Sequence, residues 1–366
     1  MVREGRGSER LGGLQAARAI AAILVVLQHL NWAADRIWDQ HDPVILFHPG
    51  AGGVALFFVL SGYVMTRGLP RRPIDFAVGR LRRIFPGLWI ALFISAGTEL
   101  LLFGAWPGID PVLFALYPTG TAPNSLVPYW TLLFELLFYG LVLVAITVFP
   151  GRSRLLVVAG LAVSFAFAPK LGSEAALFPA WDAALLTRFS LLFLIGVLLG
   201  YLPRPWGTPV ALFFAFLAAA LYWFPDISAA LGHGVSYPSF LQWNAPYGVW
   251  AVCAGLAIYG ALAWEADGLG GRVLQRIGDA SYGIYLTHVV CLFVAFRLVA
   301  QMPGFADWPA TAKYGVAALI GFVPAYLLGR AEWRLQKWLK TFSPARGWPR
   351  PAVFRQAIEA RTPGRP

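Results

Sequence analysis

Charged side chains are scarce in this 366-residue sequence. Asp, Glu, Lys and Arg make up 13% of it, while 58% of its residues are hydrophobic. Water-soluble domains carry about 25% charged residues, so the composition argues against a water-soluble globular fold. It predicts instead an all-α, polytopic integral membrane protein.

Cysteine is almost absent as well. The two cysteines, Cys253 and Cys291, lie in apolar runs and lack the spacing of metal ligands. A disulfide framework is therefore not expected, and we predict no metal site. A cleavable leader is not expected either, because the first apolar run is long and no small-residue cleavage site follows it.

Long apolar runs are abundant, and each is a candidate membrane-spanning helix. We predict about ten spans, of which the fifth and sixth have the least distinct ends. Their approximate ranges are 14–33, 53–69, 84–104, 128–149, 153–168, 186–202, 208–224, 246–264, 281–300 and 313–333.

The net charge of +11 reflects membrane topology. Most Lys and Arg residues precede the first run, lie between the second and third runs, or follow the last run. The positive-inside rule then places both termini in the cytoplasm of a multi-pass protein of the cell (inner or plasma) membrane. Membrane lipids are the expected partners, nucleic acid is not, and the oligomeric state stays open. Residues 342–366 form a basic, Pro- and Arg-rich cytoplasmic tail.

The first apolar run contains two ionisable residues, Arg18 and His29, with ten residues between them. On one helix they lie about 16 Å apart. Ionisable side chains inside a spanning helix are costly and tend to mark substrate or proton paths. The alternative is that Arg18 reaches the headgroups and that His29 only makes local hydrogen bonds.

A basic segment follows the second span. Residues 74–85 have one apolar face, which predicts an amphipathic helix at the membrane surface. Arg80 and Arg83 lie one turn apart and could present two guanidinium groups to one phosphate. The alternative is a cluster that only fixes topology.

A carboxylate, Glu135, lies within the fourth predicted span. It shares a helical face with Thr131 and Tyr139. It is predicted about 10 Å below the outer boundary, and His29 about 6 Å below it. The two depths are compatible with a His29–Glu135 pair in which the imidazole accepts a proton, and Glu99 is a rival partner.

The ninth predicted span begins with a polar stripe. Ser281, Tyr285 and His288 recur at helical spacing, and we expect them in the cytoplasmic half, at about the level of Arg18. Alone, such a stripe is more often a helix-packing contact than a site.

Five segments together resemble bacterial membrane acyltransferase family 3: LQAARAIAAILVVLQHL, GVALFFVLSGY, RLRRIFPGLW, YWTLLFELLFY and IGDASYGIYLTH. They match in order and spacing from about residue 11 to about 335. The fourth segment departs from the family pattern, because Thr131 replaces a serine and an extra residue precedes Glu135. The matching residues are Arg18 with His29, Arg80 with Arg83, Trp130 with Glu135, Phe138 and Tyr139, and Ser281 with Tyr282, Tyr285 and His288.

The resemblance implies a stand-alone membrane O-acyltransferase domain over residues 1–341, which uses acyl-CoA, most simply acetyl-CoA, as a co-substrate with no bound cofactor. It assigns catalysis to His29 as general base and to Glu135 as its orienter. The expected donor-binding residues are Arg18, Arg80, Arg83, Ser281, Tyr285 and His288. The expected acceptor-binding residues are Trp32, Asp35, Trp130 and Tyr139.

The acceptor is expected to be a hydroxyl of a cell-surface glycan or a related small molecule outside the cytoplasm. Aromatic, acidic and amide residues in the outer loops 31–52, 105–127 and 225–245 would bind it. An interfacial aromatic belt is an equally good explanation of these loops. A covalent acyl-enzyme remains open. So does the alternative function, a transporter or exporter of a glycan or lipid, since such proteins also carry polar residues in spanning helices.

Overall fold

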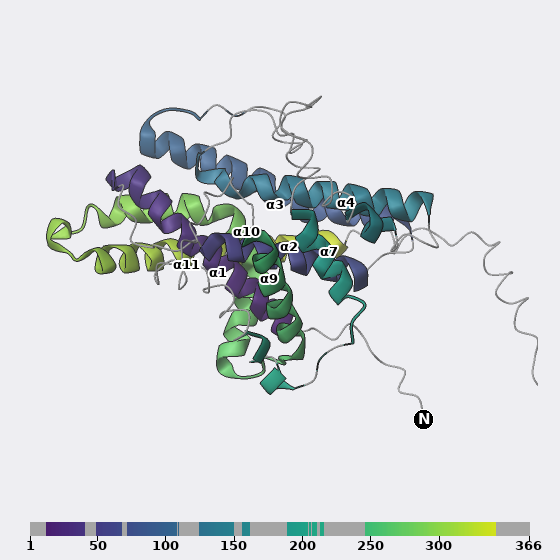
Figure 1. Ribbon diagram of the computed structural model, residues 1–366. Helices are drawn as coiled ribbons and strands as arrows, with labels where there is room; N and C mark the ends of the chain where they lie inside the picture. Colours follow the sequence, from purple (N-terminus) through teal and green to yellow (C-terminus); the bar gives the residue numbers. More distant parts are fainter. Residues whose placement is uncertain are drawn as a thin grey trace, which may run out of the picture.

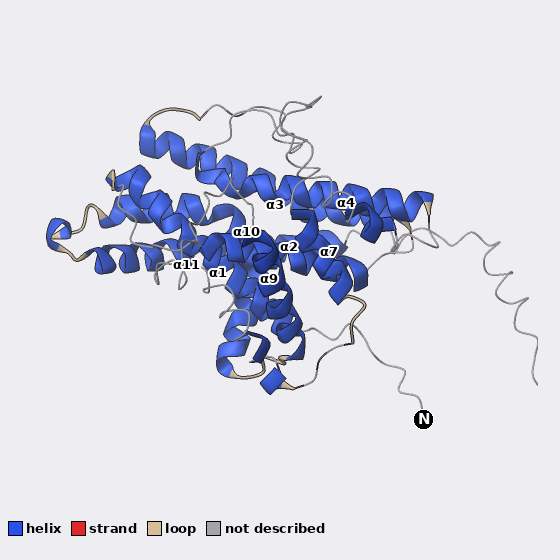
Figure 2. Ribbon diagram, viewed as in Figure 1, coloured by secondary structure: helices blue, strands red, loops and turns tan. Residues whose placement is uncertain are grey.

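The computed structural model describes residues 12–40, 49–67, 72–107, 109, 124–149, 156–161, 189–203, 205, 207–210, 213–215 and 246–341. Within these ranges the regular structure is helical throughout and no strand occurs (Figure 2). The all-α prediction is therefore confirmed for the described residues. The predicted spans 153–168 and 208–224 and the basic tail 342–366 lie largely or wholly outside them.

Six of the described helices are long and apolar enough to cross a membrane. Each corresponds to one predicted span, which supports a polytopic membrane protein. Two shorter apolar helices, α7 (Phe189–Leu199) and α9 (Pro246–Ala263), overlap two further predicted spans. The six long helices are α1 (Gly12–Trp38), α2 (Pro49–Arg67), α3 (Pro73–Phe103), α4 (Trp130–Val148), α10 (Leu269–Val299) and α11 (Ala310–Thr341).

Helices α1 and α10 lie side by side and run in the same direction (Figure 1). Arg18, early in α1, meets Ser281 before the middle of α10, and the Trp38 indole donates to the carbonyl of Phe296 near the ends of both helices. Helix α11 packs antiparallel to α10, so that Tyr314 lies beside Phe296. We call the two ends of this bundle the Arg18 end and the Trp38 end.

Helix α10 is the most enclosed of the six long helices. In the apolar 18-residue stretch of α10, 83% of the residues are buried, against 28% in the corresponding stretch of α11. Ser281, Thr287 and His288 of α10 are buried and therefore face other protein segments and not lipid, which is where polar residues of spanning helices are tolerated. A close approach of α10 and α11 requires glycine at one point, because a Cβ on Gly283 would lie 2.6 Å from Cα of Gly329.

Helix α3 differs from its prediction. A separate surface helix over 74–85 was expected beside the span 84–104. The structure has one continuous helix from Pro73 to Phe103 with Pro86 in its interior. Side chains of α10 and α11, described below, donate hydrogen bonds to carbonyls of α3 beside this proline.

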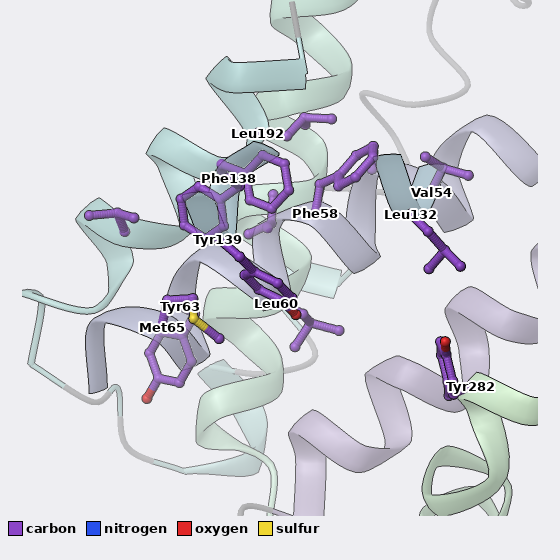
Figure 3. Packing of buried hydrophobic residues seen from close by; sticks show 14 of the residues in the cluster. Val54, Phe58, Leu60, Tyr63, Met65, Leu132, Phe138, Tyr139, Leu192 and Tyr282 are labelled. Carbon is purple, nitrogen blue, oxygen red and sulfur yellow. The ribbon is translucent and has the colours of Figure 1, made fainter. Parts of the chain in front are cut away.

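An aromatic cluster binds α2, α4 and α7 together. The rings of Phe138 and Phe193 are stacked with centroids 4.2 Å apart, and Phe58 lies 4.9 Å from Phe193. Figure 3 shows Phe58, Phe138 and Leu192 converging there, while Tyr282 of α10 lies apart from them. This packing fixes α4 against α2 and thus determines where the polar residues of α4 point.

Candidate active site

The interface between α1 and α10 carries polar contacts at two levels. At the first level, Nε of Arg18 donates to Oγ of Ser281 over 3.2 Å. At the second, Nδ1 of His29 lies 3.1 Å from Nε2 of His288. The two helices run in the same direction, so both contacts lie on one continuous interface. His288 is about 10 Å further along α10 than Ser281.

The backbone fixes the tautomers of both histidines. Nδ1 of His29 lies 2.8 Å from the carbonyl oxygen of Val25. Nδ1 of His288 lies 2.9 Å from the carbonyl oxygen of Tyr285 and 3.1 Å from that of Ile284. Carbonyl oxygens only accept hydrogen bonds, so we assign the proton of each neutral ring to Nδ1.

This assignment gives the histidine pair a direction. Nε2 of His288 carries a lone pair and accepts from the Nδ1–H group of His29, which it shares with the Val25 carbonyl. Nε2 of His29 is left without a proton. It makes no hydrogen bond to the described residues and is therefore available as a base.

Glu135 lies elsewhere than expected, and the prediction that it could pair with His29 is wrong in this structure. Its Oε1 atom accepts hydrogen bonds from Ser61, over 3.3 Å, and from the hydroxyl of Tyr139. The partner of His29 is His288. Glu135 instead lies within electrostatic range of Arg18, on the Arg18 side of the histidine pair.

Glu135 lies at this level because of where α4 begins. The 3-10 helix η2 (Asn124–Tyr129) precedes α4, and its Leu126 is fully buried. Tyr285 donates to the carbonyl of Pro128 over 3.1 Å, and the hydroxyls of Thr131 and Tyr285 lie 2.6 Å apart. Helix α4 thus begins inside the bundle, whereas the sequence predicted a start at the outer boundary, and every later residue of α4 lies closer to the Arg18 end.

Three arginines from two helices gather at the Arg18 end. The guanidinium of Arg80 lies 5.3 Å from the ring centroid of Tyr139, and that of Arg83 lies 4.4 Å from the ring centroid of Tyr282. Arg18 is within electrostatic range of Arg83 and Glu135. We call Arg18, Arg80 and Arg83 the arginine cluster. Aromatic faces hold two of its members in place.

A second carboxylate, Glu332 of α11, borders the arginine cluster. Its Oε1 atom lies 3.5 Å from Nη1 of Arg83, which is at the long end of an ion pair. Its other oxygen is buried and has no hydrogen-bond partner among the described residues, and the same is true of Nε of Arg80. Three guanidinium groups thus face two carboxylates, and the cluster keeps a positive excess that suits an anionic ligand.

Three of the residues predicted to bind the acceptor are Trp32, Asp35 and Trp130. Trp32 and Asp35 are exposed on the last turns of α1, beyond His29. Trp130 packs against Phe134 and Phe189.

Two side chains lie at other levels than expected, and their roles in binding donor or acceptor stay predictions. Tyr139 was expected near the outer side but lies under Arg80, because α4 begins inside the bundle. His288 was expected at the level of Arg18 but lies beside His29, because seven residues of helix separate it from Ser281.

Sequence reasoning missed Glu332 and Gln336. An acidic residue within the predicted span 313–333 was an available signal for Glu332, since a charge there needs a partner. Gln336 lies beyond that predicted span, and nothing in the sequence connects it to residues 82 and 83. The outer loop 225–245 and residues 41–48 and 110–123 lie outside the described residues, so the predicted acceptor loops stay predictions.

Comparison with known proteins identifies the family of the chain. Residues 11–330 match the family model for an acyltransferase domain, which covers most of the chain and all the predicted site residues. The chain belongs to membrane acyltransferase family 3. Glu332 and Gln336 lie just beyond the matched residues.

Two relatives support this assignment. The chain is 31% identical over 304 residues to the exopolysaccharide production protein ExoZ of Rhizobium meliloti (strain 1021), an alignment that covers 74% of this chain and 88% of that protein. It is 26% identical over 366 residues to the acyltransferase MdmB of Streptomyces mycarofaciens, with coverage of 87% and 89%. No solved structure matches the chain. The protein is thus a membrane-embedded transferase of acyl groups, and these relatives give no support to the transporter alternative.

Proposed function

We propose that the protein is an O-acyltransferase that moves an acyl group, most simply acetyl, from acyl-CoA in the cytoplasm to a hydroxyl of a cell-surface glycan or related acceptor. The observation that carries the proposal is the separation of two chemistries along the α1–α10 interface. A positive cluster suited to phosphates lies at the Arg18 end, and a histidine with a free Nε2 lies further along.

The donor would bind at the arginine cluster. Arg80 and Arg83 offer planar, always-charged groups to the phosphates of CoA, and such bonds are stronger than those between neutral groups. Arg18, which contacts Ser281, lies on the same α1–α10 interface as the histidine pair. The flexible arm of CoA would follow this interface and carry the thioester carbonyl toward His29.

The acceptor would approach His29 from the Trp38 end, where Trp32 and Asp35 are exposed. Nε2 of His29 removes the proton of the acceptor hydroxyl as its oxygen attacks the thioester carbon. The carbon–sulfur bond then breaks, and the proton passes from His29 to the departing CoA thiolate. The products are the O-acyl ester and free CoA thiol, so no net proton is gained or lost.

His288 would stabilise the imidazolium that forms during this step. Its Nε2 lone pair already faces the Nδ1–H group of His29, and a hydrogen bond strengthens when its donor becomes charged. His288 would thereby do what the sequence suggested for Glu135. Glu135 belongs with the donor, because it lies within electrostatic range of Arg18 and orders Tyr139 beneath Arg80.

Orientation follows the positive-inside rule. Both the first turn of α1 and the last turns of α11 lie at the Arg18 end, because Gln336 contacts the same part of α3 that carries Arg83. Basic residues concentrate near this end in the sequence, so we place it in the cytoplasm. The inner or plasma membrane is the proposed location.

The test is acyl transfer by the purified protein in lipid nanodiscs. Acetyl-CoA labelled in the acetyl group would be supplied with chemically de-esterified exopolysaccharide, and label on the polysaccharide would be measured together with free thiol. We expect both to appear in equal amounts and to depend on His29. Binding of the polysaccharide with no thiol release, in the presence of acetyl-CoA, would favour a transporter and contradict the proposal.

A further inference from the structure

Pro86 leaves a carbonyl of α3 without its normal donor. In an uninterrupted helix the N–H group of residue 86 would bond to the carbonyl of Arg82, four residues earlier. Proline has no N–H group, and its ring also crowds that carbonyl. The opened turn runs from Arg82 to Pro86 and includes Arg83, while Arg80 lies just before it. Both arginines belong to the proposed donor site.

Gln336 of α11 fills this gap. Its Nε2 atom donates to the carbonyl of Arg82 over 2.9 Å and to that of Arg83 over 3.3 Å. The Gln336 side chain is buried, with a relative exposure of 6%. A side-chain amide carries two N–H groups, so one residue can serve both carbonyls.

Tyr282 of α10 holds the next carbonyl of the same turn. Its hydroxyl donates to the Ile84 carbonyl over 2.6 Å, while the face of its ring supports the Arg83 guanidinium. Gly87 permits this approach, because a Cβ there would lie 2.8 Å from Cε1 of Tyr282. Two neighbouring helices therefore bond to the backbone of the turn that carries the arginines.

We propose that Gln336 is a positioning residue of the donor site: it supplies the hydrogen bond that Pro86 withholds from Arg82 and thereby sets the direction of the segment that carries Arg80 and Arg83. The inference rests on the proposed function, since it concerns how the acyl-CoA site is ordered. Arg80 and Arg83 lie over aromatic rings of different helices, α4 and α10. A change in the course of α3 at this turn would therefore alter both contacts together and misalign the two guanidinium groups.

The experiment is a rescue. Gln336→Leu keeps the size of the side chain and removes its donors, and we expect it to weaken acetyl-CoA binding about tenfold. Turnover at saturating acetyl-CoA should change less than about twofold, because His29 and His288 are untouched. Pro86→Ala restores an N–H group for the Arg82 carbonyl, so the Pro86→Ala/Gln336→Leu double variant should bind acetyl-CoA within about twofold of the native protein.

The control is the same substitution elsewhere. Gln301→Leu changes an exposed glutamine in the turn after α10, and it should leave acetyl-CoA binding unchanged. Dissociation constants would be measured by calorimetry in nanodiscs for all variants. Thermal unfolding would show whether each variant is folded.

The possible outcomes separate this inference from the proposed function. Native affinity in Gln336→Leu, or weak affinity in the folded double variant, would overturn the inference. If Gln336→Leu does not fold, the double variant decides: native affinity supports the inference, and weak affinity or failure to fold contradicts it. If an Arg80→Ala/Arg83→Ala variant binds acetyl-CoA normally, the proposed donor site itself is wrong.

Discussion

Nε2 of His288 lies 3.1 Å from Nδ1 of His29, and with the proton of His29 assigned to Nδ1 it accepts a hydrogen bond from that atom. The arrangement resembles that of a catalytic imidazole oriented by a carboxylate, with a neutral ring in place of the carboxylate. Burying a neutral ring in a membrane interior costs less free energy than burying a charged group would. We therefore expect His288 to act on catalysis through His29.

His288→Ala should lower turnover by about 10- to 100-fold, since a hydrogen bond to a charged group contributes about 1.5–3 kcal/mol. His288→Gln should retain more activity, because its amide oxygen can accept from the same Nδ1–H group. Both would be measured as thiol release at saturating acetyl-CoA. Acetyl-CoA affinity serves as the control and should stay native. Full activity in His288→Ala would mean that this contact is only packing.

Arg80→Ala and Arg83→Ala should each weaken acetyl-CoA binding at least about tenfold, because each removes charged hydrogen bonds to phosphate. Arg83→Lys should recover only part of the loss, since a planar fork becomes a point charge. Calorimetry would measure the affinities, with expression and thermal unfolding followed separately. Native affinity in the double Ala variant would refute the donor site.

Glu332→Gln should tighten acetyl-CoA binding by a few-fold. Two effects compete, because the carboxylate both steadies Arg83 and repels the donor phosphates. The Arg83–Glu332 contact is long, at 3.5 Å, and Tyr282 supports Arg83 independently, so we expect the loss of repulsion to dominate. Affinity at two salt concentrations would check this, since the gain should shrink at high salt. Weaker binding in the variant would show that Glu332 mainly steadies Arg83.

Glu135→Gln should act on donor affinity more than on turnover. Glu135 orders Tyr139 beneath Arg80, and its hydrogen bonds to described residues go to Ser61 and Tyr139 and not to His29. The amide keeps its hydrogen bonds and loses its charge, so we expect a change in acetyl-CoA affinity with turnover within about threefold of native. A large fall in turnover at native affinity would instead support the role that the sequence suggested, as the orienter of His29.

Helix content and much of the site could be predicted from the sequence. The apolar runs predicted the six long helices. The spacing of Arg18 and His29 correctly predicted that two polar side chains lie at different levels of one helix. The Arg18–Ser281 contact also follows from depths along the two helices. These features depend on local periodicity and on the fixed rise of a helix.

The errors arose where tertiary contacts decide the position of a helix. The start of α4 depends on the buried 3-10 helix before it and on Tyr285, and neither is a local property of residues 128–149. Glu135 and Tyr139 were therefore assigned to the wrong level. The hydrogen bond of Gln336 to the Arg82 carbonyl of α3 joins residues about 250 positions apart, which no local pattern could indicate.

The central claim is that donor binding and proton transfer occupy separate levels of one interface. Acetyl-CoA affinity and acetyl transfer, measured on the same preparation of His29→Ala, test it most directly. We predict native affinity together with a loss of transfer of about 10²- to 10⁴-fold, the contribution typical of a general base. Transfer at the native rate, or a loss of affinity as large as that caused by Arg80→Ala/Arg83→Ala, would contradict the account.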